Sequence, residues 1–157
     1  LSNKKGKLKF YIPVINGLEV PPLASLEKKK KPYKEKIIDV LTLDDFNLKN
    51  VDLIKIDVEG HEYFVIEGAI NTIKKNKPVI ICEIEKRHSL TSLDKITKLL
   101  KKLNYEGIFL SKNKINSINA FKYNIHQKPF LNDVENKQYI NNFIFYHKSY
   151  IKNFKYF

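Results

Sequence analysis

Three carboxylates and one imidazole follow a short apolar run in the segment IKIDVEGHE, residues 54–62. They belong to Asp57, Glu59, His61 and Glu62. A carboxylate or an imidazole can accept a proton from a reacting group, and the ordinary pKa of histidine suits proton transfer near neutral pH. Glu59 and Glu62 are three residues apart and share a face once a helix has begun. That pair can hydrogen-bond hydroxyl groups or hold a divalent ion through oxygen ligands.

A second acidic pair, Glu83 and Glu85, ends the apolar run PVIICEIE at residues 78–85. Alternate residues of a strand point to the same face, so these two side chains are predicted to lie together. The chain has no G-x-S-x-G, no H-E-x-x-H and no cysteine cluster, which removes support for a hydrolase or a zinc site. The remaining histidines are isolated and are interpreted as structural or surface groups: His88, His126 and His147.

The elements that must position these side chains follow from the hydrophobic periodicity. Strands are predicted at residues 7–12, 37–43, 51–58, 78–85, 105–111 and 143–150. One helical period follows Glu59, stops before Pro78, and places these residues inward: Val65, Ile66, Ala69, Ile70 and Ile73. A second helix, capped by Thr91 or Ser92, is predicted to bury Leu93, Ile96, Leu100 and Leu103. The lysine run 28–31 and the stretch 112–138 are predicted to be loops.

This alternation of strands and helices is typical of an α/β domain with parallel strands and right-handed crossovers. Residues 51–58, 78–85 and 105–111 are expected to be parallel neighbours, with 143–150 antiparallel among them. In such sheets ligands collect at the carboxyl ends of the strands. Both acidic clusters follow consecutive strands, so the sequence predicts one acidic, ligand-facing edge.

Composition limits the class of protein. A chain of 157 residues with 43% hydrophobic and 29% charged residues is long enough for one globular domain. The net charge of +12 comes from 29 basic residues of which only Arg87 is an arginine, which argues against specific nucleic-acid recognition because base and phosphate contacts favour arginine forks. No apolar run approaches a membrane span, no signal peptide is visible, and Cys82 is a lone core thiol, so a cytoplasmic protein is predicted.

Four ordered blocks give the chain a specific resemblance. The segments TLDDF (42–46), DLIKIDVEGHEYFVIEGA (52–69) and KPVIICEIE (77–85) resemble the signature of the FkbM-type methyltransferases. LSNKKGKLKFYIP (1–13) is similar to the stretch that precedes this signature in the family. The resemblance covers residues 1 to about 110.

The resemblance implies a Rossmann-like, class I methyltransferase sheet and the cofactor S-adenosyl-L-methionine. It also implies O-methylation of a hydroxyl on a glycan or another hydroxylated metabolite. On this mapping residues 51–58, 78–85, 105–111 and 143–150 are the fourth to seventh strands, the seventh antiparallel. The first three strands would precede Leu1, and the chain, which contains no methionine, is interpreted as the C-terminal part of a longer protein. It departs from the family in having no G-x-G, so the glycine loop and the acid that hold the cofactor are absent.

The resemblance also suggests roles for the acidic clusters. Asp57, Glu59 and His61 are the catalytic candidates, with Asp57 as general base, acceptor of the substrate hydroxyl or partner of the cofactor's amino group. Glu62, Glu83 and Glu85 are the substrate-binding candidates, and Asp57 with Gly60 would contact the cofactor. The alternatives are a helix N-cap for Asp57 and a first-turn acid stabilised by the helix dipole for Glu62. The metal requirement and the oligomeric state stay open.

Two other functions are compatible with the sequence. The missing glycine loop favours a non-catalytic α/β module that binds an anionic glycan or makes peripheral contact with an anionic lipid surface. A basic nucleic-acid-binding domain is the third hypothesis and rests on charge alone.

Overall fold

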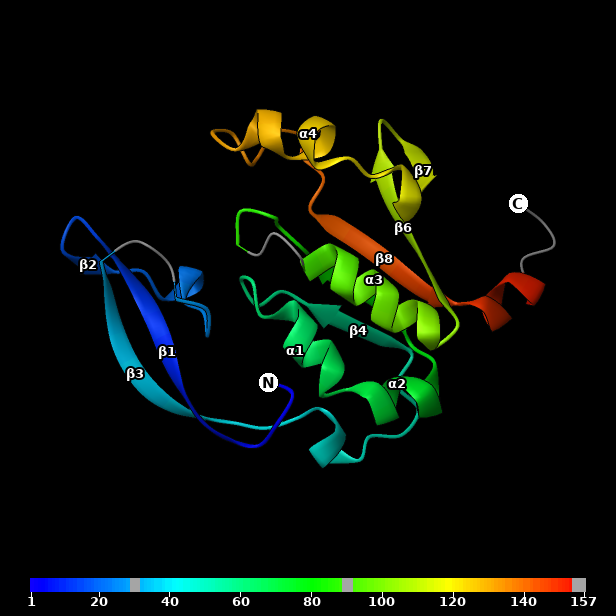
Figure 1. Ribbon diagram of the computed structural model, residues 1–157, viewed down its shortest axis with the longest axis horizontal. Helices are drawn as coiled ribbons and strands as arrows, with labels where there is room; N and C mark the ends of the chain where they lie inside the picture. Colours follow the sequence, from blue (N-terminus) through cyan, green and yellow to red (C-terminus); the bar gives the residue numbers. More distant parts are fainter. Residues whose placement is uncertain (29–31, 89–91, 154–157) are drawn as a thin grey trace.

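The computed structural model describes residues 1–28, 32–88 and 92–153. Most of the predicted lysine loop, residues 29–31, and the candidate cap Thr91 lie outside the described residues. The chain forms a five-stranded mixed sheet with helices packed on it and a separate three-stranded antiparallel ribbon, which projects to the left in Figure 1. The mixed α/β class predicted from the sequence is confirmed.

The five-stranded sheet has the order β4-β5-β8-β6-β7. Its strands are β4 (Leu53–Ile56), β5 (Val79–Glu83), β6 (Tyr105–Ser111), β7 (Lys114–Ser117) and β8 (Asn142–His147). β4 and β5 pair in parallel, with Ile56 opposite Cys82, whereas β8 is antiparallel to both β5 and β6. The parallel pair and the antiparallel last strand were predicted correctly.

The prediction that residues 143–150 lie antiparallel among the other strands is confirmed, and it is this strand that separates residues 105–111 from β5. β6 runs in the same direction as β5, but β8 lies between them. Phe143 and Phe145 of β8 are fully buried, at 0% and 1% exposed. Burial of two large apolar side chains on one short strand stabilises the fold most in the middle of a sheet, because both neighbouring strands and the helices exclude water there.

The core lies between the sheet and three helices, α1 (Glu62–Glu67), α2 (Ile70–Asn76) and α3 (Ser92–Lys102). The inward residues of α3 are Leu93, Ile96 and Leu100, as the helical period predicted, and Leu103 packs against the same core. On β5, Ile80 and Cys82 face this core. Burial raises the pKa of the Cys82 thiol, which agrees with its prediction as an inert core residue.

The single helix predicted between Glu59 and Pro78 is two helices, α1 and α2, broken at Gly68–Ala69. Gly68 lies against the backbone of Ser2, and its carbonyl oxygen accepts a hydrogen bond from the Asp44 N–H at 3.0 Å. The Asp44 carboxylate in turn accepts hydrogen bonds from the first turn of α2, at Asn71 N (3.0 Å) and Thr72 N (2.8 Å). Asp44 therefore caps the start of α2, a helix far along the chain.

The antiparallel ribbon has the order β2-β1-β3, with β1 at Gly6–Ile15, β2 at Leu18–Glu19 and β3 at Tyr33–Val40. The strand predicted at 7–12 is confirmed. The strand predicted at 37–43 begins earlier and ends earlier, because β3 starts at Tyr33 and stops at Val40. Ion pairs across the ribbon neutralise some of its charges, as Lys9 with Glu35 at 2.8 Å shows.

The stretch 112–138, predicted to be irregular, contains β7, the short helix α4 (Tyr123–His126) and two 3₁₀ turns. β7 pairs with β6 through a tight turn at Lys112 and Asn113, whose φ angles are 50° and 60°. Two consecutive positive φ angles are what a type I′ hairpin turn requires. The sequence pattern missed this hairpin because the turn contains no glycine.

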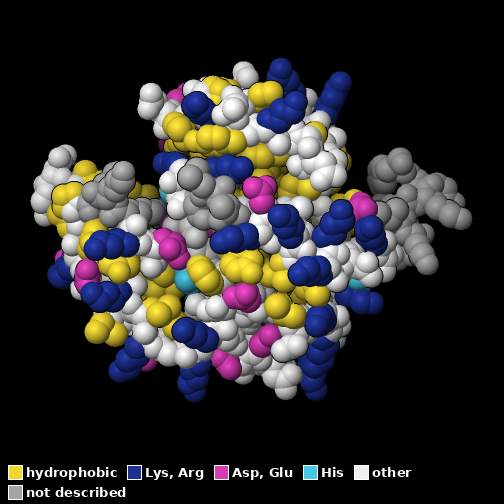
Figure 2. Space-filling model, viewed as in Figure 1, with side chains coloured by type: hydrophobic (Ala, Val, Ile, Leu, Met, Phe, Trp, Pro, Cys, Tyr) yellow, Lys and Arg dark blue, Asp and Glu magenta, His cyan; other side chains and the backbone are white. Residues whose placement is uncertain are grey.

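Lysine side chains are scattered over the face in view in Figure 2, with acidic side chains between them, and they form no single stripe there. Nucleic-acid-binding surfaces instead gather their basic residues along one path. Within the described residues, no helix has the length and apolar character that crossing a membrane requires.

Candidate active site

The acidic edge predicted from the sequence forms at the carboxyl ends of β4 and β5. Parallel pairing of Ile56 with Cys82 brings the residues that follow these two strands side by side. One small cleft is lined by Asp57, Glu59, Glu62, Glu83, Glu85 and His88. Five of the six were predicted. His88, which the sequence placed among the isolated histidines, joins them.

Glu59 and Gly60 form a tight turn between β4 and α1. Their φ angles are 55° and 105°, so both adopt the left-handed backbone that glycine tolerates best. A Cβ atom on Gly60 would also lie 3.1 Å from the Cβ of His88, which is tighter than an ordinary contact. The Glu59 carboxylate lies 3.1 Å from the Nδ1 of His88, so the turn is held against the segment that follows β5.

Glu62 has a structural position at the start of α1. It is 2% exposed, and its Oε1 accepts a hydrogen bond of 2.6 Å from the Gly60 N–H. An acid in the first turn that bonds a preceding backbone N–H stabilises the helix start. This geometry supports the alternative that the sequence left open for Glu62.

Asp57 does not have the capping role that was its alternative. The N-cap position of α1 is His61, and no side chain makes a cap hydrogen bond there. The Asp57 carboxylate instead points to solvent, with its side chain 52% exposed, and lies 3.6 Å from the Nζ of Lys55. The residue is therefore available to a ligand at the cleft.

His61 is engaged on the other side of the turn. Its Nε2 lies 3.0 Å from the Ser2 hydroxyl, and its Nδ1 lies 2.8 Å from the Oε1 of Glu27. A serine, a histidine and an acid in this order also occur in hydrolases, but a nucleophile must be accessible and Ser2 is 2% exposed. Both ring nitrogens thus tie the amino-terminal segment and the region of Glu27 to α1.

Glu83 is the half-buried carboxylate of the cleft. Its Oε2 lies 3.8 Å from the Nζ of Lys55, and its Oε1 accepts a hydrogen bond of 2.8 Å from the side-chain amide of Asn141. Burial and the negative charge of Asp57 raise the pKa of Glu83, while Lys55 lowers it. A carboxylate with a raised pKa is a stronger base than an ordinary one.

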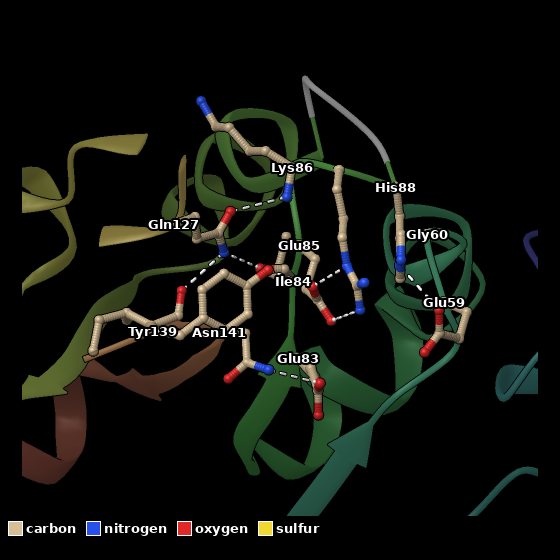
Figure 3. Close-up of polar contacts among 12 residues, drawn as sticks. Glu59, Gly60, Glu83, Ile84, Glu85, Lys86, His88, Gln127, Tyr139 and Asn141 are labelled. Atoms are coloured by element: carbon tan, nitrogen blue, oxygen red, sulfur yellow. Dashed lines mark hydrogen bonds and ion pairs between the residues drawn. The ribbon is translucent and has the colours of Figure 1, made fainter. Parts of the chain in front are cut away.

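Glu85 is held in a different environment from Glu83. It is buried and accepts hydrogen bonds from the Arg87 guanidinium and from the Tyr139 hydroxyl (Figure 3). Burial alone raises the pKa of Glu85, but the bonds from Arg87 and Tyr139 outweigh it and hold the pKa below its ordinary value. Its two oxygens are thus engaged by protein donors.

We expect the substitution Tyr139→Phe to lower the stability of the fold by about 1–3 kcal/mol at neutral pH, because a buried carboxylate loses a donor. A carboxyl group with a depressed pKa stabilises the folded state above its unfolded pKa, and this contribution disappears as the pH falls through the folded value. The deficit should therefore shrink in acid. Thermal unfolding of the parent protein and of Tyr139→Phe, from neutral to acid pH, measures this deficit.

Tyr146→Phe is the matched control, because the Tyr146 hydroxyl donates to the Glu106 carboxylate at 3.1 Å on the exposed surface. An exposed bond of this kind contributes little, so this variant should unfold like the parent protein. Equal losses in the two variants would contradict the assignment of Glu85 as a buried, ionised anchor.

Three residues of the site have no local sequence pattern that identifies them: Gln127, Tyr139 and Asn141 (Figure 3). They come from the segment between β7 and β8 and hydrogen-bond to the segment that holds Glu83 and Glu85. The sequence did contain a signal for Arg87, which shares the partner Glu85 with Tyr139. Arg87 is the one arginine in a lysine-rich chain and follows Glu85 closely. In the described part of the chain, no group of three or more acidic, histidine or cysteine side chains is arranged to hold a metal ion.

An apolar groove of about 440 Å³ runs along the outer side of β4 and reaches Asp57. Leu53, Ile54 and Val65 are among its lining residues, and Leu53 is 54% exposed. No strand in the described residues pairs with this edge of β4.

Comparison with protein families gives one match. Residues 1–106 match the family described as the methyltransferase FkbM domain. No curated protein and no solved structure matches the chain. The matched region contains both acidic clusters and ends within β6, so β7, α4 and β8 lie beyond it.

Proposed function

We propose that this chain, which belongs to the FkbM methyltransferase family, is the acceptor-binding part of an enzyme that transfers a methyl group from S-adenosyl-L-methionine. The acceptor is a hydroxyl group of a glycan or of another hydroxylated metabolite. The observation that supports this proposal is the position of Glu83, a half-buried carboxylate with a raised pKa beside Asp57 and Lys55. It lies at the ligand-binding edge of a parallel strand pair.

The chemistry of O-methylation suits this arrangement. The oxygen of the acceptor must lose its proton as the new carbon–oxygen bond forms, and Glu83 can take that proton. Asp57, exposed and close to Lys55, can accept a hydrogen bond from a neighbouring hydroxyl and so orient the acceptor. The bound cofactor supplies an electrophilic methyl group.

The residues described here fit only part of that cofactor. Carboxylates at the cleft suit its cationic sulfonium end, but the chain has no G-x-G and hence no glycine loop for the remainder of the molecule. We assign that role to a segment preceding Leu1 in the polypeptide, whose strand would pair with the open edge of β4. The apolar groove along β4 supports this assignment, because an open, apolar sheet edge otherwise favours aggregation.

We expect the isolated chain to bind S-adenosyl-L-methionine weakly or not at all, since the backbone donors of the glycine loop are missing. A longer natural polypeptide that includes the preceding segment should bind it measurably. Calorimetry on both proteins tests this expectation. Micromolar binding by residues 1–157 alone would show that the acidic edge and the groove suffice.

Methyl transfer tests the proposed activity directly. The longer polypeptide is incubated with cofactor labelled in its methyl group and with a panel of neutral and acidic oligosaccharides. Transfer to a hydroxylated acceptor, and not to its deoxy analogue, is the expected result. Cofactor binding without transfer to any hydroxyl acceptor would contradict the proposal.

The ribbon favours a second candidate, a non-catalytic module that contacts an anionic glycan or lipid surface. Ile37 on β3 is 72% exposed, lies opposite Lys9 of β1 and shares its face with Lys7. Lys9 is paired with Glu35 and Lys7 lies opposite Asp39, so the support for an anionic membrane surface is the exposed apolar side chain flanked by lysines, in a chain of net charge +12. Sedimentation of the chain with anionic vesicles, together with no methyl transfer, would favour this candidate.

A further inference from the structure

Asn141 makes a directed contact with Glu83. Its side-chain Nδ2 donates to Glu83 Oε1 at 2.8 Å, and its own Oδ1 accepts from the Nδ2 of Asn142 at 2.9 Å. A carboxylate can only accept, so the NH2 end of the Asn141 amide must face Glu83. The bond from Asn142 to the amide oxygen of Asn141 agrees with this orientation. Glu83 Oε1 thus has a hydrogen-bond donor from the protein, whereas Oε2 lies 3.8 Å from the Nζ of Lys55.

Gln127 holds the backbone on both sides of this contact (Figure 3). Its Nε2 donates to the carbonyl oxygens of Ile84 and Ile140, each at 2.8 Å, and its Oε1 accepts from the Lys86 N–H at 3.0 Å. Ile84 follows Glu83, and Ile140 precedes Asn141. Gln127 is 1% exposed, so these bonds are protected from water and hold the two segments together.

The backbone itself adds one more connection. The Ile84 N–H donates to the Asn141 carbonyl oxygen at 2.7 Å, which continues the pairing of β5 and β8 beyond Glu83. β5 thus pairs Glu83 with Asn142, and Asn141, the residue before β8, is held beside Glu83 by this fixed register. Their contact does not depend on a mobile surface side chain.

We propose that Asn141 is a positioning residue for Glu83, with Gln127 holding both in place, and this inference rests on the proposed function. The amide favours the ionised form of Glu83 and leaves Oε2 for the acceptor. A hydrogen bond to the charged form of a carboxyl group favours that form, so it opposes the burial and the charge of Asp57. The segment that carries Asn141 lies outside the family match.

The test follows the titration of Glu83 by carbon NMR of its side-chain carboxyl group. The signal of this group is assigned by its loss in Glu83→Gln. Asn141→Ala removes the donor, so the midpoint of this titration should move to higher pH. Asn141→Asp keeps the size of the side chain and adds a negative charge, so the midpoint should move further in the same direction. This second variant decides the matter if the alanine variant does not fold.

Asn136→Ala is the matched control, because the Asn136 side chain also donates to a carboxylate, that of Asp133, at 3.1 Å on the exposed surface. It should leave the Glu83 midpoint unchanged. In a longer polypeptide that transfers the methyl group, the rising limb of the pH–rate profile should move with the NMR midpoint, and kcat should recover at higher pH. A role in packing alone would not produce this recovery.

An unchanged Glu83 midpoint in folded Asn141→Ala or Asn141→Asp would overturn the inference, as would an equal shift in Asn136→Ala. The NMR titration needs no activity. If the midpoint moves but no methyl transfer is found with any acceptor, the coupling of Asn141 to Glu83 stands and the proposed enzymatic function fails.

Discussion

Replacing Glu83 by glutamine is expected to lower the rate of methyl transfer at saturating acceptor by about 10²–10⁴-fold, the usual contribution of a general base. Glutamine has the same shape and still accepts the hydrogen bond from Asn141, so the site keeps its geometry. Only the ability to take the proton is lost. Single-turnover methyl transfer in the longer polypeptide measures this change.

The same substitution should leave the protein as stable as before or slightly more stable at neutral pH. Burial and Asp57 raise the pKa of Glu83, so its contribution to stability is present at low pH and is lost as the pH rises through the folded pKa. A neutral side chain avoids that loss. A lower rate together with an unchanged or higher Tm would therefore separate a catalytic role from a structural one.

Two further variants make the result specific. Glu106→Gln changes an exposed acid of β6, paired with Lys148 at 3.4 Å, and should leave the rate within about twofold of the parent, since exposed pairs contribute little. Asp57→Asn tests the residue that the sequence identified as the general base, since Glu83 was predicted there to bind the substrate. If Asp57→Asn lowers the rate far more than Glu83→Gln does, Asp57 is the base and Glu83 orients the acceptor. If neither Asp57→Asn nor Glu83→Gln lowers the rate, the cleft is not the site of proton transfer.

The sequence predicted the acidic edge because that edge depends on local patterns. Continuous apolar runs place β4 and β5, and parallel pairing then places Asp57 beside Glu83. The division of labour among the acids was not predictable in the same way. Whether a carboxylate faces a ligand or a protein donor depends on partners distant in sequence, as Tyr139 is for Glu85.

The same reason explains what the sequence missed in the fold. The hairpin at Lys112 and Asn113 lacks a glycine, although both residues have positive φ. The helix break at Gly68 has no local cause, because glycine alone only lowers helix stability by about 1 kcal/mol. It is the crossing of the amino-terminal segment that divides α1 from α2.

That crossing predicts a large effect on stability for Gly68→Ala. A Cβ atom at this position would lie 2.0 Å from the Ser2 carbonyl oxygen, far closer than two non-bonded atoms can approach. Ser2 cannot retreat easily, because its N–H donates to the Leu41 carbonyl at 2.8 Å and its hydroxyl contacts His61 at 3.0 Å. We expect a loss of about 3 kcal/mol or more, at the upper end for overpacked sites. Chemical denaturation measures this loss.

Gly17→Ala separates steric contact from backbone strain. Gly17 has a φ of 80° and nothing within 4 Å of its added Cβ, so only the strain of about 1–2 kcal/mol applies there. Gly68 is not in the left-handed region, so its larger penalty must come from contact with Ser2. A loss at Gly68 no greater than the loss at Gly17 would contradict this reasoning.

A second experiment on Gly68 uses the atom that causes the clash. Because that atom is a backbone oxygen, no side-chain change at residue 2 can remove it, but deletion of residues 1–3 does. The deletion alone should cost stability, since it removes the bonds of Ser2 to Leu41 and His61. In the shortened chain, however, Gly68→Ala should cost almost nothing, because its Cβ then meets no backbone oxygen. A penalty that persists after the deletion would place the cause elsewhere in the break between α1 and α2.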